Sequence, residues 1–305
     1  MLVQNNAIKT IGFVSLFALV VLFWVNSGGW ITPDLFFLGA LVITALTGKL
    51  GQFVKNWAPL LLILFAYEYV RGLVPDMVTR THTYELIQWE VQLFGFIPTV
   101  YLQKLFWHGY VQWFDIALVF IYTLHFVMPQ IFAYLLWMKS KVKFRLFAVS
   151  LILLSIAGVI TYYVFPATRP CLASTWGSLE KVHLIQNEVY KSMNFQHFFT
   201  IPKEFSLYSQ AGANPVAAFP SLHSAYPFLI ALFAVYFYGR RGLPLLIYPA
   251  LVWFFVIYSG DHYFIDVFAG VVYASMAFLG VIFIYKYYKQ LLNMCDLKKR
   301  PRNLN

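Results

Sequence analysis

Eight apolar runs, separated by short polar segments, are the feature that most limits how this chain can fold. They cover roughly residues 8–26, 32–49, 57–75, 112–137, 144–165, 220–238, 243–259 and 264–286. Runs of about 18–25 residues are long enough for an α-helix to cross the hydrocarbon core of a bilayer. Hydrophobic residues make up 61% of the 305 residues and charged residues only 11%, which excludes an ordinary soluble domain. We therefore predict an all-α, polytopic membrane bundle of about eight transmembrane helices.

Lysine and arginine residues concentrate in every second connection between these runs. The clusters are Lys49 with Lys55, the basic residues of 139–145, Arg240 with Arg241, and the basic residues of 298–302. Because cytoplasmic loops of membrane proteins carry this excess, the pattern predicts that both termini are cytoplasmic. Orientation in the bilayer thereby explains the net charge of +10, and no nucleic-acid partner is predicted.

Two long connections, about 76–110 and 167–218, then lie on the outer side of the membrane. The first is rich in aromatic residues and poor in charged ones, which favours short helices lying in the membrane interface. The second is more polar, and we expect it to cover the ends of the helices.

The segment 219–270 is predicted to be a helical hairpin whose two far ends meet on the outer side. Its two apolar runs are joined by a short basic turn, so the chain must cross the bilayer and return. One end carries Ser221 and His223, and the other carries His262 and Asp266. Histidines and a carboxylate gathered at one water–lipid boundary indicate chemistry.

His262 and Asp266 share one helix face if the last run begins near Asp261, because they are four residues apart. A carboxylate in this position accepts a hydrogen bond from one ring nitrogen. The other nitrogen is then free to attack phosphorus, which predicts a phosphohistidine intermediate. The same pattern also fits a polar helix start with no catalytic role.

Pro220 is suited to the first position of a helix, so we expect a helix start there. Its unpaired N–H groups, together with the Ser221 hydroxyl, would bind a phosphate. His223 in the same turn would protonate a leaving alkoxide as a general acid. The alternative is an ordinary helix start with a histidine that reaches towards the interface.

Three further charged residues are predicted at the outer membrane boundary, level with the two histidines. Arg169 would bind phosphate oxygens, unless it only anchors lipid headgroups. Glu68 and Arg71 are three residues apart near the outer end of the third run. Arg71 would be a second phosphate ligand positioned by Glu68, or the two form a structural ion pair. His125 is expected to be hydrogen-bonded within the bundle, and the other histidines lack the spacing of metal ligands, so no metal or other cofactor is predicted.

Two motifs give the chain a resemblance to a known family. The segments 219–224 and 260–266 resemble the second and third signature motifs of the type 2 phosphatidic acid phosphatase superfamily. Within it, the segments 67–72, 93–103 and 165–170 make the chain most similar to the inositol phosphorylceramide synthase-like branch. The bacterial members of that branch include lipid phosphotransferases.

The resemblance implies that His262 is the nucleophile, Asp266 its orienting partner and His223 the general acid, and that catalysis needs no metal. One position departs from the superfamily pattern. A lysine typically stands seven residues before the arginine of the first motif, and here that position is Tyr162. The departure favours the synthase-like branch and leaves open which arginine is the main phosphate ligand.

These features predict a membrane enzyme that cleaves a lipid phosphoester at the outer face. A lipid alcohol as acceptor would make it a phosphotransferase, for example of a phosphoinositol-like headgroup from a phospholipid donor. Water as acceptor would make it a phosphatase of phosphatidic acid-type or polyprenyl phosphates. A non-enzymatic alternative is a lipid or anion transporter, which would bind phosphate without cleaving it. The expected organisation is N-terminal transmembrane helices in 1–56, a catalytic membrane domain in 57–290 and a basic cytoplasmic tail in 291–305.

Overall fold

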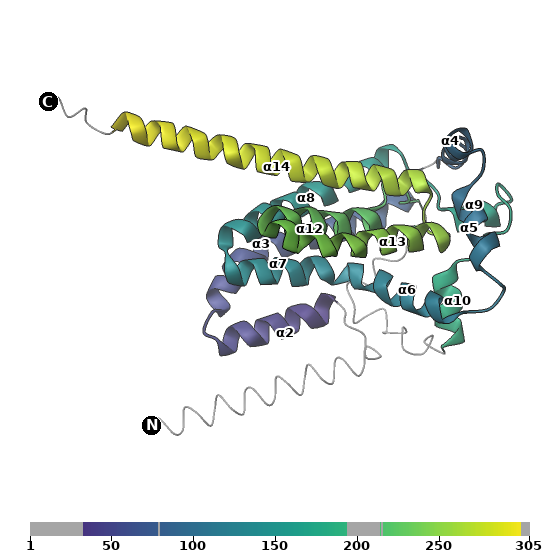
Figure 1. The fold of residues 1–305 in the computed structure, drawn as a ribbon, viewed down its shortest axis with the longest axis horizontal. Coiled ribbons are helices and arrows are strands. Elements are labelled where there is room, and N and C mark those ends of the chain that lie inside the picture. The colour runs from purple at the N-terminus through teal and green to yellow at the C-terminus, as the bar shows by residue number, and fades with distance from the viewer. Residues whose placement is uncertain (1–32, 79, 194–213, 215, 300–305) are drawn as a thin grey trace, which may run out of the picture.

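The structure, a computed structural model, describes residues 33–78, 80–193, 214 and 216–299 (Figure 1). The predicted helix at 8–26 and the connection 194–213 lie outside the described residues. Within these ranges the chain is helical, and its β-structure consists of two isolated bridges.

The helices follow one another through short connections. In order they are α2 (Pro33–Leu46), α3 (Leu50–Met77), α4 (Tyr84–Phe94), α5 (Pro98–Phe106), α6 (Trp113–Thr123), η1 (Leu124–Phe126), α7 (Met128–Lys139), α8 (Lys141–Val164), α9 (Pro170–Thr175), α10 (Ile185–Ser192), α12 (Leu222–Tyr238), η2 (Gly239–Leu246), α13 (Ile247–Tyr258) and α14 (Phe264–Lys299). The long helices α3, α8, α12 and α14 pack lengthwise, while α4, α5, α9 and α10 gather at one end of the bundle (Figure 1). We call this end, at which α12 and α14 begin, the site end.

In the described part of the chain, four helical stretches are long and apolar enough to cross a membrane. They are Leu50–Pro75, Lys141–Val164, Leu222–Tyr258 and Phe264–Gln290, and the bent pair α6 and α7 is a fifth if it counts as one span. The prediction of an all-α membrane bundle is therefore confirmed, but the number of eight spans is not. Within the described residues, the predicted span at 32–49 corresponds to α2, Pro33–Leu46, which is not among the candidate spans.

The predicted helical hairpin is present. The stretch Leu222–Tyr258 turns back at η2, so that α12 and α13 run side by side (Figure 1). The indole nitrogen of Trp253 on α13 donates a hydrogen bond of 3.1 Å to the Ser224 carbonyl on α12. At the turn, a Cβ on Gly242 would lie 2.4 Å from the backbone of Ala234, so only glycine fits there. The hairpin therefore returns the chain to the site end.

The predicted span at 112–137 is broken in its middle, where α6 and α7 meet at an angle of 48° around η1. The cause is Pro129 in the first turn of α7. Proline cannot donate a hydrogen bond to the carbonyl four residues earlier, that of His125, and its ring crowds that carbonyl. The break leaves His125 buried between two helix ends.

The last helix begins at Phe264, as the predicted run 264–286 does. It starts two residues after His262 and not near Asp261, the start that a shared helix face of His262 and Asp266 required. It continues to Lys299, beyond the predicted end at residue 286 and into the predicted basic tail. Because His262 precedes the helix, its contact with Asp266 depends on the turn between α13 and α14 and not on a shared helical face.

Two large apolar clusters hold the bundle together. The first joins α3, α7, α8 and α12 around buried side chains such as Trp57, Trp137, Phe147 and Phe233. The second joins α6, α10 and α13 and includes Phe255. Burial of this much aromatic surface provides the main stabilisation of the arrangement. A third, smaller cluster at the site end contains Leu86, Ala167, Ala218 and Tyr263.

Three connections at the site end are fastened together by backbone hydrogen bonds. Single parallel β-bridges join His82 to Ala167 and Ala167 to Ala217. The hydroxyls of Thr83 and Thr168 add a side-chain hydrogen bond of 2.7 Å. We call these bridges and this hydrogen bond the loop clip. It fixes the segments that follow α8 and precede α12 relative to α4.

Basic residues gather at the opposite end of the bundle. Lys139 and Lys143, at the turn between α7 and α8, lie over the ring of Tyr238 at the end of α12, and Lys141 lies over Trp137. Since α12 starts at the site end, this cluster is one helix length away from it. The predicted separation of basic turns from the candidate site is therefore present.

Candidate active site

His223 and His262 face each other where α12 begins and the turn after α13 ends. The distance between His223 Nδ1 and His262 Nε2 is 2.8 Å, a hydrogen-bond distance. His262 is only 3% exposed, and His223 is half-buried. The two predicted catalytic histidines, 39 positions apart in the sequence, are therefore in direct contact.

Asp266 is fully buried in the first turn of α14 and holds the turn before it. Its Oδ2 accepts a hydrogen bond of 2.9 Å from the Tyr263 N–H and lies 3.4 Å from His262 Nδ1. Because Nδ1 faces the carboxylate, Nε2 is the ring nitrogen that faces His223 and is available for chemistry. The His262 ring also interacts with the backbone of Ala218. The predicted His262–Asp266 contact is present, although the local backbone differs from the prediction.

Arg169 approaches the same site from the residue before α9. Its Nη1 donates a hydrogen bond of 3.3 Å to Asp261 Oδ1, and the Gln186 side chain on α10 donates one of 3.4 Å to the same oxygen. Asp261 Oδ2 accepts from the Ser259 hydroxyl at 3.3 Å. Arg169 Nε and Gln186 Oε1 are buried, and neither has a hydrogen-bond partner among the described residues. Asp261 thus holds Arg169 and Gln186 beside His262.

Gln186 is a neighbour of the site that sequence reasoning missed. It lies in the polar connection after α8 and forms no motif with the histidines. The sequence suggests Asp261 only as a possible helix start. In the structure its carboxylate instead fixes the side chain of Arg169.

Ser221 is the N-cap of α12, whose first helical residue is Leu222 and not the predicted Pro220. The Ser221 hydroxyl accepts a hydrogen bond of 3.3 Å from the Ser224 N–H. The backbone N–H of Ser221 donates one of 2.9 Å to the Asp266 carbonyl. A Cβ on Gly270 would lie 2.3 Å from the Ser221 carbonyl oxygen. The starts of α12 and α14 are therefore in backbone contact, and this contact sets the separation of the two histidines.

Arg71 and Tyr162 lie near the start of α12, which carries His223. Arg71, on α3, is close enough to both side chains to interact with them electrostatically. Tyr162 is buried, and its hydroxyl donates a hydrogen bond of 2.9 Å to the Pro220 carbonyl. Tyr162 stands where the first superfamily motif typically has a lysine. It supports the loop before α12 through its hydrogen bond and supplies no positive charge. Glu68 is on α3, but its side chain lies outside the described part of the structure.

His125 lies beside the histidine pair. Its Nδ1 is hydrogen-bonded to the Tyr122 carbonyl, which confirms that it is bonded within the bundle. Its ring centroid is 4.6 Å from that of His223, and the Tyr122 hydroxyl lies 3.5 Å from His223 Nε2. This proximity was not predicted, because it results from the break between α6 and α7.

Glu90 on α4 is the second residue that sequence reasoning missed. It is fully buried, and its Oε1 accepts a hydrogen bond of 2.9 Å from the Ile265 N–H in the first turn of α14. The two residues are 175 positions apart, so no local spacing announces the contact. The connection 76–110 holds three acidic residues, Asp76, Glu85 and Glu90, and nothing in the sequence distinguishes Glu90 from the other two.

Burial controls the protonation of the site. The pKa of His262 is lowered from 6.5 to about 4, mainly because burial disfavours the imidazolium; the Asp261 carboxylate opposes this shift and Arg169 adds to it. Burial raises the pKa of Asp261, and Arg169 beside it opposes that rise. His262 is therefore neutral at pH 7, which is the form with a nucleophilic nitrogen.

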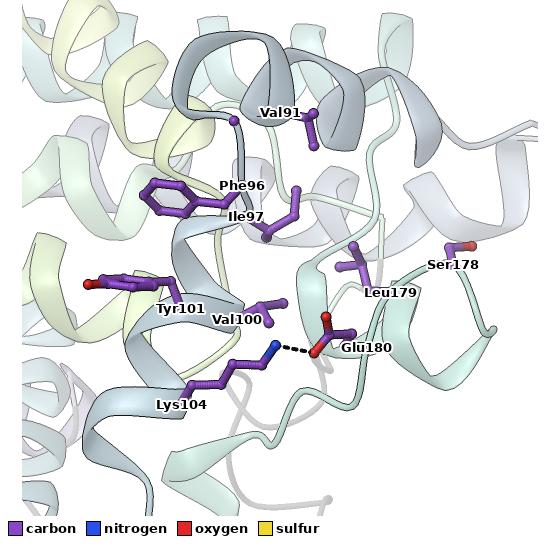
Figure 2. A pocket seen from close by; sticks show the side chains of 10 residues that line it. Val91, Phe96, Ile97, Val100, Tyr101, Lys104, Ser178, Leu179 and Glu180 are labelled. Carbon is purple, nitrogen blue, oxygen red and sulfur yellow. Dashed lines mark ion pairs between the residues drawn. The ribbon is translucent and has the colours of Figure 1, made fainter.

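A cavity of about 410 Å³ lies at the site end, between α4, α5 and the segment 178–180 (Figure 2). Lys104 and Glu180 form an ion pair of 2.5 Å at one side of it, and the rest of the lining is mostly apolar. None of the predicted site residues lines this cavity. Another face of α5 supports the site, since the Thr99 hydroxyl donates to the His262 carbonyl at 3.4 Å.

The described ranges contain no group of three or more histidine, cysteine, aspartate or glutamate side chains that could hold a metal ion. Metal independence nevertheless stays a prediction, because other parts of the chain are not described.

The two histidine motifs, the contact between them and the helical bundle define a family. The chain belongs to the PAP2 superfamily, whose model matches residues 84–280, from the start of α4 into α14. Phosphoinositol dihydroceramide synthase from Bacteroides thetaiotaomicron is 32% identical over 158 residues, which are 51% of this chain and 50% of the relative. The chain therefore spans about half the length of the curated relative it matches. No solved structure matches the chain significantly. These findings confirm the predicted superfamily and its inositol phosphorylceramide synthase-like branch.

Proposed function

We propose that the protein is a metal-independent lipid phosphotransferase that works through a phosphohistidine intermediate. It moves a phosphorylated headgroup, of the phosphoinositol type, from a phospholipid donor to a lipid alcohol. The observation that carries this proposal is the 2.8 Å contact between His223 Nδ1 and His262 Nε2, with Asp266 against the other ring nitrogen. Family membership supports the broader class of lipid phosphotransferase or phosphatase.

In the first step, His262 Nε2 attacks the phosphorus of the donor. An N–P bond forms, the P–O bond to the diacylglycerol breaks, and His223 gives its proton to the departing alkoxide oxygen. Asp266 accepts the hydrogen bond from His262 Nδ1–H and stabilises the positive charge that develops on the ring. The products of this step are diacylglycerol and the phosphohistidine that carries the headgroup.

In the second step, His223 removes the proton from the hydroxyl of the acceptor. The hydroxyl oxygen attacks the phosphorus, the N–P bond breaks, and His262 returns to its starting form. Water in place of the lipid alcohol would complete a hydrolysis by the same route. The choice of acceptor thus separates a transferase from a phosphatase.

The similarity to a phosphoinositol dihydroceramide synthase favours transfer of a phosphoinositol headgroup to a ceramide-like alcohol. The matched segment is half of each chain, so this substrate assignment rests on the shared region alone. The short helices α4 and α5 also suit an amphiphilic acceptor, because both expose apolar side chains such as Leu93 and Tyr101 at the site end.

Arg169 and Arg71, which both interact electrostatically with His223, are proposed to bind the phosphate oxygens. Asp261 holds Arg169, whose buried Nε–H has no acceptor among the described residues and would donate to phosphate. The Ser221 hydroxyl oxygen accepts from the helix start, so its hydrogen is the part that would contact the substrate. Glu68 is proposed to position Arg71 on α3.

The site end is proposed to face the outer side of the membrane, with both termini in the cytoplasm. The lysines around the α7–α8 turn support this orientation, because positive residues mark the cytoplasmic ends of membrane helices. The donor and acceptor would then reach His262 from the outer leaflet.

Purified protein in mixed micelles with a chelator, labelled phosphatidylinositol and dihydroceramide tests this function. We expect a new phosphoinositol-bearing lipid, and its formation should fall by about 10²-fold or more in His262→Ala and His223→Ala. Asp266→Asn should retain more activity than His262→Ala, because it keeps the nucleophile. Trapping the intermediate with labelled donor alone should label His262.

The outcomes separate the alternatives. Release of inositol phosphate into water without a lipid acceptor would make the protein a hydrolase. Loss of activity in the chelator would contradict metal independence. Turnover by His262→Ala at the wild-type rate would remove the nucleophile assignment. The transporter would be favoured if the donor crosses vesicle membranes, this transport persists in His262→Ala, and no new lipid is formed.

A further inference from the structure

The start of α14 has two acidic partners, and only one of them belongs to the proposed catalytic set. The first N–H groups of an α-helix have no partner within the helix and need an acceptor from elsewhere. Asp266 accepts from the Tyr263 N–H at 2.9 Å. Glu90, from α4, accepts from the Ile265 N–H at 2.9 Å and also interacts with the Phe264 N–H.

Glu90 is an unusual choice of acceptor for the first N–H groups of α14. Its side chain is fully buried although α4 is a short helix at the edge of the bundle, and its second oxygen, Oε2, has no hydrogen-bond partner among the described residues. A buried carboxyl group without full hydrogen bonding is destabilising. A serine, threonine or asparagine at the helix start would satisfy the same N–H groups without that destabilisation.

The contact joins two segments that must keep a fixed distance for the proposed chemistry. Ile265 and Asp266 are adjacent in the first turn of α14, so an acceptor that fixes the Ile265 N–H also fixes the Asp266 backbone. Asp266 in turn contacts His262 through Oδ2. A shift of about 1 Å at this turn would be enough to separate the carboxylate from the imidazole, because their present distance of 3.4 Å is already long.

We propose that Glu90 is a positioning residue of the catalytic dyad, which holds the first turn of α14 so that Asp266 stays against His262. This inference rests on the proposed function, because it assigns Glu90 a part in the reaction of that same site. Glu90 acts through backbone N–H groups and does not touch the substrate.

The protonation of Glu90 should also make the site sensitive to pH. Burial raises its pKa from 4.5 to about 7, the Ile265 N–H opposes this rise, and the Asp266 carboxylate adds to it. The titratable groups that face it are Asp266 and Tyr263, both at the start of α14. Glu90 therefore gains its negative charge as the pH rises through about 7, and the hydrogen bond from His262 to Asp266 should respond in the same range.

Glu90→Ala, Glu90→Gln and His262→Ala test the inference, with Glu85→Ala as the matched control. Glu85 is on the same helix, but it pairs with His82 and is partly exposed. Glu90→Ala should lower kcat at least tenfold and leave KM within twofold. Glu90→Gln keeps an oxygen that accepts from Ile265, so it should retain at least half of the wild-type kcat. Glu85→Ala should behave as wild type.

A spectroscopic measurement separates this inference from the proposed function, because it needs no turnover. The protein contains seven histidines, and ¹⁵N-histidine labelling in detergent micelles gives a His262 signal that is assigned by its loss in His262→Ala. In the wild type this signal should shift with an inflection near pH 7. The inflection should disappear in Glu90→Gln and persist in Glu85→Ala.

The results decide each claim separately. If the wild type turns over and depends on His262, a wild-type kcat in Glu90→Ala overturns the positioning role. A kcat in Glu90→Gln as low as that in Glu90→Ala also overturns it, because the acceptor oxygen would then not be what matters. If no donor is turned over, the proposed function fails, and the His262 signal alone decides. A His262 signal in Glu90→Ala at the wild-type position then overturns the positioning role, whereas an inflection unchanged in Glu90→Gln overturns only the titration of Glu90. If Glu90→Ala does not fold, kcat in Glu90→Gln decides, because a value at least tenfold below the wild type would mean that the acceptor oxygen is not what matters.

Discussion

His262 is the residue on which the proposed chemistry depends, and its environment defines its form. It is nearly inaccessible to solvent, and burial holds its pKa near 4. A buried neutral imidazole beside a carboxylate is a stronger nucleophile at neutral pH than a histidine that is partly protonated. Exclusion of water would thus prepare His262 for the proposed role of nucleophile.

The pH dependence of activity follows from this shift. Protonated His262 cannot attack phosphorus, so the loss of rate that His262 itself causes should come when the pH drops through about 4, and not through the ordinary histidine pKa of 6.5. Between these values the unfolded chain binds the proton and the native site does not, so acid also lowers stability over this range. Initial rates at pH 4–8 in a stable detergent would show it. A half-maximal rate near pH 6.5 that is also found in Glu90→Gln would contradict a buried His262.

Arg169 is expected to act on binding more than on chemistry. Arg169→Ala should raise the KM for the donor by about tenfold, the size of a lost charge-assisted hydrogen bond, with a smaller effect on kcat. Asp261→Asn serves as the comparison, because it keeps Arg169 but weakens the contact of 3.3 Å that holds it. Steady-state kinetics with a short-chain donor would measure both. An unchanged KM in Arg169→Ala would leave Arg169 as an anchor for lipid headgroups.

Among the elements, the hairpin of α12 and α13 was the part that the sequence predicted best. Two apolar runs and a basic turn with glycines leave the chain little choice but to return. The break at His125 was not predicted, although Pro129 was visible, because a long apolar run hides a bend. The contact between Glu90 and α14 was beyond prediction, because it depends on how an interfacial helix packs against a segment 175 residues away.

Gly270 is the point at which α14 touches the start of α12. A methyl group there would lie 2.3 Å from both the Ser221 carbonyl and the Ser224 hydroxyl, so the helices would have to move apart. Gly270→Ala should therefore destabilise the protein by about 1–3 kcal/mol and lower kcat by separating His223 from His262. Gly280→Ala, on the same helix with nothing within 4 Å of its Cβ, is the matched control. Thermal unfolding in detergent and kcat would be compared. Full activity in Gly270→Ala would mean that the contact does not set the histidine distance.

At the scale of the whole molecule, the proposed orientation can be tested directly. Lys181 is exposed at the site end, and Arg240 is exposed at the turn of the hairpin at the other end. In a chain whose two native cysteines are replaced by serine, a membrane-impermeant maleimide on intact cells should label Lys181→Cys and not Arg240→Cys. Permeabilised cells provide the control, since both positions should then react. Labelling of Arg240→Cys alone would invert the orientation and place the site in the cytoplasm.

The loop clip has a consequence for how such enzymes can diversify. Its bridges between His82, Ala167 and Ala217 are formed by backbone atoms, which every residue except proline can provide in full. The bridges therefore do not depend on which side chains stand at these positions, and only the bond between the Thr83 and Thr168 hydroxyls does. A lineage could alter its choice of lipid by exchanging residues in the clipped loops, while the inherited reaction centre beneath them stays as it is.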